Sequence, residues 1–298
     1  LVAVKVFRLD ITPEQARALA DELSRAAEVG LFHSSIVEPV AAGVEGTVAY
    51  RAEEYVAAES LDVAMRHYAP ATLEKALPFI TQLASAIDFA KGAGVGHGAL
   101  HPRDIFVTPD EARATGFGVV DALERMGLRA PVRRPYSPPE RIAGRPWNTS
   151  ADVFSLGVIA FELLTGRRPS GLGDEIGPLN GATLGGRADE VRAVLVRAMH
   201  EDPAKRHETA LAFSAALANA AGVPEPAFDP AIAAMGVSAE PSADPELRIA
   251  PTEPIDVLTE LPLKAAPASA EPSPEVLIQP DADFTVEAAT APSLTELT

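Results

Sequence analysis

The sequence predicts an α+β fold, with a small strand-rich part, a larger helical part and then a disordered tail. Short alternating apolar patterns occur in residues 1–56. Residues 57–222 carry apolar side chains at three- and four-residue spacing, as amphipathic helices do. Neither pattern persists in residues 223–298. Because the strands precede the helices, we expect two lobes within one domain of residues 1–222.

The first predicted strand occupies residues 1–7, where three valines alternate with other residues: Val2, Val4 and Val6. The chain starts with Leu1, which is not a methionine, and this residue already belongs to the strand. We therefore expect the sequence to be a fragment of a protein whose start lies upstream.

A helix is predicted to follow the first strand. Thr12 is a favourable N-cap, and Pro13 suits the first helical position. Gln15 completes the spacing of a capping box with Thr12. An apolar stripe then extends the helix to about Val29.

Two more strands are predicted next, over residues 36–41 and 47–56, with Glu45-Gly46 at the turn between them. Four helical segments follow, over residues 73–91, 153–164, 188–200 and 209–221. The second of them is apolar on nearly every face, which predicts a helix buried among other helices. Gly166 is expected to end it.

The composition limits the classes of function. The 298 residues carry a formal charge of −17, which argues against nucleic acid or an anionic membrane as the main partner. The chain has no cysteine, which excludes disulfides and thiolate chemistry and is typical of a reducing compartment. We find no apolar run long enough to cross a bilayer and no signal peptide, and we expect a cytoplasmic protein.

The tail differs sharply from the rest in charge and composition. Residues 223–298 contain 14 acidic residues against Arg248 and Lys264, and 13 of the 27 prolines. Such a segment buries too little apolar surface to offset its conformational entropy. We therefore predict that it is disordered.

Seven local motifs occur along residues 1–220 in a fixed order. They are Val2-Ala3-Val4-Lys5, Glu54-Tyr55-Val56, His97-Gly98-Ala99-Leu100-His101-Pro102-Arg103-Asp104-Ile105, Thr115-Gly116-Phe117-Gly118, Pro138-Pro139-Glu140, Ser150-Ala151-Asp152-Val153-Phe154-Ser155-Leu156-Gly157-Val158 and Asp202-Pro203-Ala204-Lys205-Arg206. Together they resemble the protein kinase family, in its V-A-I-K strand, hinge, H-R-D-L-K-P-x-N-I loop, D-F-G, A-P-E, buried helix and D-P-x-x-R motifs. The resemblance implies a bilobal kinase-like fold with a partial N-terminal β lobe and a helical C-terminal lobe.

The positions that carry phosphoryl transfer differ from the family pattern. The catalytic aspartate is replaced by Ala99, the neighbouring lysine by His101 and the D-F-G aspartate by Gly116. Asp104 stands at the metal-binding asparagine and is the one substitution that could still hold a hard cation. The threonine that kinases place before A-P-E corresponds to Arg133. Transfer depends on a base, a metal and charge neutralisation, so we expect negligible catalysis.

The sequence leaves open whether the chain binds a nucleotide. The resemblance implies that Lys5 holds the α/β-phosphates, with Glu22 as its partner, while Glu54 and Val56 lie at the hinge. Lys5 could equally be a solvated strand residue. Glu53 precedes the hinge, where kinases have an apolar or small residue, and a carboxylate there needs a partner or a raised pKa. The glycine-rich loop would precede Lys5 and is absent from this sequence.

The retained positions have structural roles in the family. The resemblance implies that Asp152 holds the backbone of the catalytic loop and that Glu140 pairs with Arg206. The remaining three are His97, as a packed residue, and Phe117 with Gly118, at the entry to the activation segment.

Four arginines make the region after the D-F-G position locally basic: Arg125, Arg129, Arg133 and Arg134. They suit a docking patch for a phosphorylated or acidic partner, for the acidic tail of this chain, or an ordinary solvated surface.

These observations predict a catalytically impaired kinase-like domain, a pseudokinase that acts as a binding or regulatory module in signalling. Protein partners are expected, and ATP and Mg²⁺ remain open as ligands. Two alternatives stay open: an active serine/threonine kinase with atypical residues, and an interaction domain that binds no nucleotide.

Overall fold

The computed structural model describes residues 1–222, except 180–183 and 185, together with residues 286–287. All of the described residues belong to one compact unit. The predicted disorder of residues 223–298 therefore lies outside the described residues, apart from Val286 and Glu287.

The N-terminal sheet has the strand order β2-β3-β1-β7. Strand β1 (Val2–Phe7) pairs antiparallel with β3 (Val48–Glu54), and β3 pairs antiparallel with β2 (Pro39–Glu45). The two-residue strand β7 (Val286–Glu287) adds to the other edge of β1. The predicted second strand was placed too early, because Ile36 makes only an isolated bridge to Ala114, a residue outside this sheet.

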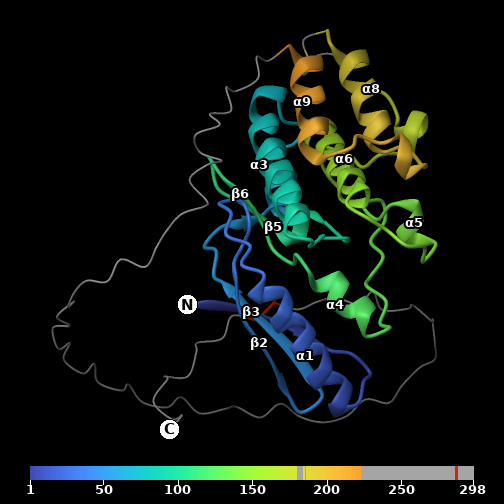
Figure 1. Ribbon diagram of the computed structural model, residues 1–298. Helices are drawn as coiled ribbons and strands as arrows, with labels where there is room; N and C mark the ends of the chain where they lie inside the picture. The colour runs from blue at the N-terminus through green and yellow to red at the C-terminus, as the bar shows by residue number, and fades with distance from the viewer. Residues whose placement is uncertain (180–183, 185, 223–285, 288–298) are drawn as a thin grey trace, which may run out of the picture. The chain divides into compact units, whose positions relative to one another are not determined.

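Helix α1 (Pro13–Glu28) begins with the predicted capping box, in which the Thr12 hydroxyl and the Gln15 amide satisfy each other's backbone N–H groups at 3.3 and 2.9 Å. Its apolar face includes Leu19 and Leu23, which are fully buried with Phe7 of β1. Figure 1 shows α1 lying along β2 and β3.

A second, three-stranded sheet was not predicted. It consists of β4 (Glu59–Ser60), β5 (Ile105–Val107) and β6 (Ala112–Ala114), and helix α2 (Leu61–Tyr68) follows β4 directly. These strands have two or three residues each, too few to show a period of two. Strand β5 begins at Ile105, so the sheet fixes the C-terminal end of the loop that carries the kinase-like motif.

The helical part contains α3 (Leu73–Gly92), α6 (Ser150–Thr165), α8 (Ala188–Ala198) and α9 (Ala210–Ala221), which pack together in Figure 1. As predicted, α6 is buried on nearly every face and ends at Gly166, whose φ is +68°. Shorter elements complete it: the helices α4 (Val119–Arg125) and α5 (Pro139–Ile142) and the 3₁₀ turns η1 (Pro102–Asp104), η2 (Gly173–Ile176) and η3 (Pro203–Lys205). Among the described helices, none combines the length and hydrophobicity that crossing a membrane requires.

Candidate functional site

The loop from His97 to Ile105 is fixed by a single carboxylate of α6. The two oxygens of Asp152 accept hydrogen bonds from the backbone N–H groups of His97, at 3.0 Å, and Gly98, at 2.7 Å. Asp152 is fully buried, and burial raises the pKa of its carboxyl to about 7. This residue therefore positions the loop backbone.

His97 is a packed residue of the interior. Its Nε2 lies 2.9 Å from the carbonyl oxygen of Thr115, and its ring meets Phe117 edge-on with centroids 5.1 Å apart. Burial lowers the pKa of His97 to about 4, so the ring is neutral at neutral pH. The loop is thereby tied to the segment that follows β6.

That segment turns through two glycines in the left-handed region. Gly116 has φ +95° and Gly118 has φ +79°, with the buried Phe117 between them. A Cβ at Gly116 would lie 3.6 Å from the Lys5 Nζ, so position 116 faces the lysine but offers it no side chain. The N–H of Gly118 donates to the Gly96 carbonyl at 3.0 Å.

Asp104 forms the charged centre of this region. Lys5 Nζ lies 3.4 Å from one of its oxygens, and Arg133 Nη1 donates to the other at 2.7 Å. The carboxylate is buried, which by itself raises a pKa, but the charges of Lys5 and Arg133 hold the pKa of Asp104 at about 2. One carboxylate is thus shared by two cations, and Arg133 reaches it from the activation segment.

Glu22 does not pair with Lys5, which corrects the sequence prediction. Its oxygens instead accept from Arg25 at 2.6 Å and from Arg125 at 2.7 Å. The physical reason is the helix α4, which packs against α1 and brings Arg125 to Glu22. The carboxylate beside Lys5 is instead that of Asp104, the candidate metal ligand.

Two other altered positions, Ala99 and His101, lie in the same loop as Asp104. Ala99 is half-buried, and its N–H donates to His97 Nδ1 at 3.3 Å. The ring of His101 meets Tyr136 edge-on with centroids 4.5 Å apart, and its Nδ1 accepts from the Arg103 N–H at 3.1 Å. Burial, followed by the charge of Arg133, lowers the pKa of His101 to about 4.

A buried polar network lies behind the site, on β3. Arg51 is 1% exposed and donates to the Phe117 carbonyl at 2.7 Å, while its Nε lies 3.1 Å from Glu53. Thr115 donates its hydroxyl hydrogen to the same carboxylate. Glu53 therefore has the partner that its burial demands. The sequence showed two charged residues alternating within a predicted strand, which was the available signal for this pair.

The hinge residues lie at the end of β3 and directly after it. Glu54 receives two hydrogen bonds from the Arg113 guanidinium, which lies on β6, and so links the two sheets. Side-chain hydrogen bonds from Arg113 lower the pKa of Glu54. The Val56 carbonyl accepts from the Ala58 N–H at 2.9 Å.

Trp147 lies against the kinase-like loop. A Cβ at Gly98 would lie 2.5 Å from its ring, and one at Gly96 would lie 2.8 Å from it. Real Cβ atoms do not approach so closely, so the indole occupies the space that side chains there would need. The Trp147 Nε1 donates to Glu124 of α4 at 2.8 Å, and Arg141 lies over the ring.

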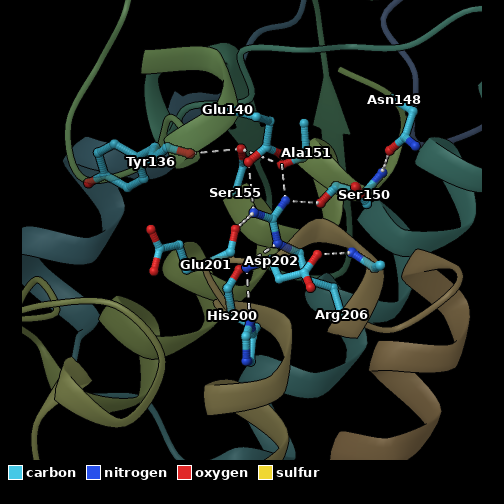
Figure 2. Close-up of polar contacts among 11 residues, drawn as sticks. Tyr136, Glu140, Asn148, Ser150, Ala151, Ser155, His200, Glu201, Asp202 and Arg206 are labelled. Carbon is cyan, nitrogen blue, oxygen red and sulfur yellow. Dashed lines mark hydrogen bonds and ion pairs between the residues drawn. The ribbon is translucent and has the colours of Figure 1, made fainter. Parts of the chain in front are cut away.

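The helical part contains a buried bidentate ion pair, shown in Figure 2. Arg206 donates to both oxygens of Glu140, at 2.6 and 2.8 Å. The same guanidinium also donates to the carbonyls of Ser150, His200 and Glu201. Every part of the arginine fork is therefore engaged, and the pair joins α5 to the start of α6 and to η3.

These features identify a class of protein. Residues 1–209 match the family model described as the protein kinase domain, and the chain therefore belongs to the protein kinase family. The resemblance inferred from the motifs is confirmed, and so is the α+β kinase-like fold.

Several bacterial kinases are similar to the chain. A probable serine/threonine-protein kinase of Clostridium acetobutylicum is 28% identical over 56% of this chain and 26% of its own length. Serine/threonine-protein kinase PknA of Mycobacterium tuberculosis is 31% identical over 42% of this chain and 30% of its own length. The crystal structure of the M. tuberculosis PknI kinase domain, C20A mutant, superposes with a TM-score of 0.59 at 25% identity, covering 74% of this chain and 85% of that one. The chain thus spans less than a third of these two curated relatives.

Proposed function

We propose that this chain is a catalytically impaired kinase-like domain, a pseudokinase, that serves as a binding or regulatory module for partner proteins. The observation that carries the proposal is the cluster of Lys5, Asp104 and Arg133. Its one carboxylate lies between two cations, next to a glycine at position 116.

This arrangement is unsuited to Mg²⁺. A divalent cation needs oxygen ligands, and bringing it to Asp104 would place it beside Lys5 and Arg133. Within the described part of the chain, no group of three or more acidic or histidine side chains is arranged to hold a metal. The residues present therefore do not fit the metal that the family uses, and we derive no step through it.

A general base is also lacking at the usual position. Ala99 has no titratable group, and the buried His97 and the half-buried His101 have pKa values of about 4. The ring of His97 is also engaged by the Thr115 carbonyl oxygen and packs against Phe117. A positioned base contributes about 10²–10⁴-fold to such reactions, and metal and cationic groups contribute further. Without a positioned base and a bound metal, transfer of a phosphoryl group should fall below detection.

The proposal includes the division into residues 1–222 and 223–298, with the N-terminal lobe in residues 1–56 and the C-terminal lobe in residues 57–222. It also includes a cytoplasmic location, supported by the lack of cysteine.

Phosphotransfer from radiolabelled ATP to a generic basic protein tests the proposal, with the full chain, Mg²⁺ or Mn²⁺, and an active bacterial kinase as positive control. We expect no label above that of the Lys5→Met variant. Clear transfer that Lys5→Met abolishes would establish an active kinase with atypical residues and overturn the proposal.

A thermal-shift titration distinguishes a regulatory module that binds nucleotide from one that does not. A rise in Tm with ATP shows that the folded chain binds nucleotide, because a ligand selective for the folded state stabilises it. No rise at millimolar ATP, with or without Mg²⁺, indicates an interaction domain without nucleotide.

A further inference from the structure

A hollow of about 450 Å³ lies between the end of α3, helix α4 and the segment that leads into α6. Its lining includes Gly94 and Val95 after α3, Asp121 of α4 and Trp147 before α6. No residue of the charged cluster around Asp104 lines it, so the hollow is separate from that cluster. A hollow of this size can hold the end of a long side chain or a small molecule.

Asp121 contributes a carboxylate that has no cation beside it. The side chain is half-buried, and it forms no ion pair with any described residue. Its hydrogen bond from the Gly96 N–H is long, at 3.5 Å. The charges of Arg125 and Arg141 act on it from beyond ion-pair distance, and each of these arginines pairs with a glutamate. Burial raises the pKa of Asp121, as expected of a carboxylate without a close counter-charge.

A second carboxylate lies close to the same loop. A Cβ at Gly96 would lie 3.7 Å from an oxygen of Asp152, and the N–H of Gly96 approaches Asp121. Burial and then the charge of Asp121 raise the pKa of Asp152. Within the described part of the chain, Asp152 also lacks an ion pair. Two acidic groups therefore meet beside the hollow without a cation, and a bound cation would offset their repulsion.

The hollow offers further hydrogen-bond acceptors. The carbonyl groups of Gly94 and Val95, which line it, accept no hydrogen bond from the described residues. A guanidinium presents five N–H donors in one plane, so it can pair with a carboxylate and donate to carbonyls at the same time. The neighbouring Arg141 has a similar set of partners, because it pairs with Glu124 and lies over the Trp147 ring.

We propose that this hollow binds a guanidinium group, which an arginine side chain of a partner protein or a small alkylguanidine supplies. The group pairs with Asp121 and donates to the carbonyls of Gly94 and Val95. Lys91, the cation that lines the hollow, is exposed, so its ammonium can stay in water while the guanidinium enters. The site is a recognition site, and it takes no part in phosphoryl transfer.

The fluorescence of Trp147 tests the proposal in the full chain, because this residue is the single tryptophan and lines the hollow. One probe is butylguanidinium, and the other is a pentapeptide with a central arginine between alanine and serine residues. The comparison probes are butylurea and the same peptide with citrulline, which have nearly the same shape without the charge. We expect both guanidinium probes to change the fluorescence saturably, with half-saturation on the order of 1 mM, and the neutral probes to bind at least about tenfold more weakly. Tighter binding of the peptide than of butylguanidinium identifies a partner protein as the source, and the reverse order identifies a small molecule.

Variants locate the binding. Asp121→Asn removes the charge and keeps the shape, and it should weaken both guanidinium probes at least about tenfold. Because it also removes an unpaired carboxylate near Asp152, its Tm should equal or exceed that of the wild type. The matched control is Asp110→Asn, which removes an exposed carboxylate outside the hollow and should change the affinity by less than about twofold. Circular dichroism verifies that each variant is folded.

Three results would overturn the proposal. One is no saturable binding of either guanidinium probe, by fluorescence and by titration calorimetry. Another is binding that Asp121→Asn leaves unchanged or that the neutral probes match. The third is a clear fall in the Tm of Asp121→Asn, which would show that the carboxylate already has a cationic partner in the folded chain. None of these results bears on phosphotransfer, so the hollow and the impaired catalytic site are tested separately.

Discussion

At the scale of single residues, Asp104 replaces an asparagine of the family pattern and forms ion pairs with two cations. In the family pattern its position holds a metal ligand, and here its oxygens are engaged by Lys5 and Arg133. Both cations are largely buried, where pairing with a carboxylate offsets part of the cost of removing their charges from water. Asp104 is therefore expected to act in folding stability.

The pH dependence of stability tests this role. The folded-state pKa of Asp104, about 2, lies below its ordinary value of 3.8. Its contribution is therefore fully present above about pH 4 and is lost as the pH falls from about 4 to about 2. We expect Asp104→Asn to lower the free energy of unfolding by roughly 2 kcal/mol at pH 7, by urea titration, and by progressively less below pH 4.

Glu208→Gln provides the control for this titration, since it removes an exposed carboxylate. It should change the free energy of unfolding by no more than about 0.5 kcal/mol. A difference between wild type and Asp104→Asn that stays constant from pH 7 to pH 3 would show that the ionised carboxylate is not the stabilising partner.

The sequence could indicate which residues occupy the site but not all of their partners. The motifs located His97, Asp104, Gly116 and Asp152 because these positions lie at fixed offsets within local patterns. One partner of Asp104, Arg133, lies 29 residues away in the chain. The family pattern gave its position before A-P-E but not its pairing with Asp104. Such a pair is set by tertiary packing, which no local pattern encodes.

At the scale of elements, strand β3 carries a polar network through the interior. Arg51, Glu53 and Thr115 join this strand to the carbonyl of Phe117. Burial lowers the pKa of the Arg51 guanidinium, and the charge of Glu53 opposes the shift. Removing one of these polar groups alone should therefore lower the stability more than removing all of them together.

A pair of variants tests this dependence by urea denaturation. Arg51→Met alone leaves the buried Glu53 carboxylate without its cation, and we expect a loss of about 3–5 kcal/mol in the free energy of unfolding. Combining Arg51→Met with Glu53→Met and Thr115→Val removes all three polar side chains. The triple variant should recover most of the loss, to within about 2 kcal/mol of wild type, with the Phe117 carbonyl left unpaired. Equal losses in the two variants would contradict the network.

Element prediction succeeded where local signals were strong. Helix α1 has a complete capping box, and α6 and α9 have long apolar patterns. The short helices α2 and α4 were missed, and so were β4, β5 and β6, because segments of two to eight residues show too few turns or alternations. Their formation depends on neighbours such as α1, against which α4 packs.

At the scale of the whole molecule, the charge separates into two regions. Residues 223–298 carry a net charge of −12 out of the total of −17. The one described segment among them, β7, pairs with β1 through only two residue pairs. The core of the described unit is formed within residues 1–222.

Truncation tests the proposed boundary. A chain ending at Gly222 should fold, with a Tm within about 4 °C of the full chain, since two residue pairs contribute on the order of 1 kcal/mol. As a matched control, a chain ending at Glu208 also loses α9. Phe213 and Leu217 of that helix are fully buried, and Asp88 accepts hydrogen bonds from its first N–H groups. This control should fail to fold. Failure of the chain ending at Gly222 would place the boundary beyond that residue.

The packing of Trp147 on Gly98 also constrains the evolutionary history of the chain. Gly98 has φ +71°, and any Cβ there would collide with the indole ring. An arginine at position 98, where the family motif has one, therefore requires a smaller residue at position 147. The two positions are coupled, and a longer side chain at 98 is tolerated only after the change at 147.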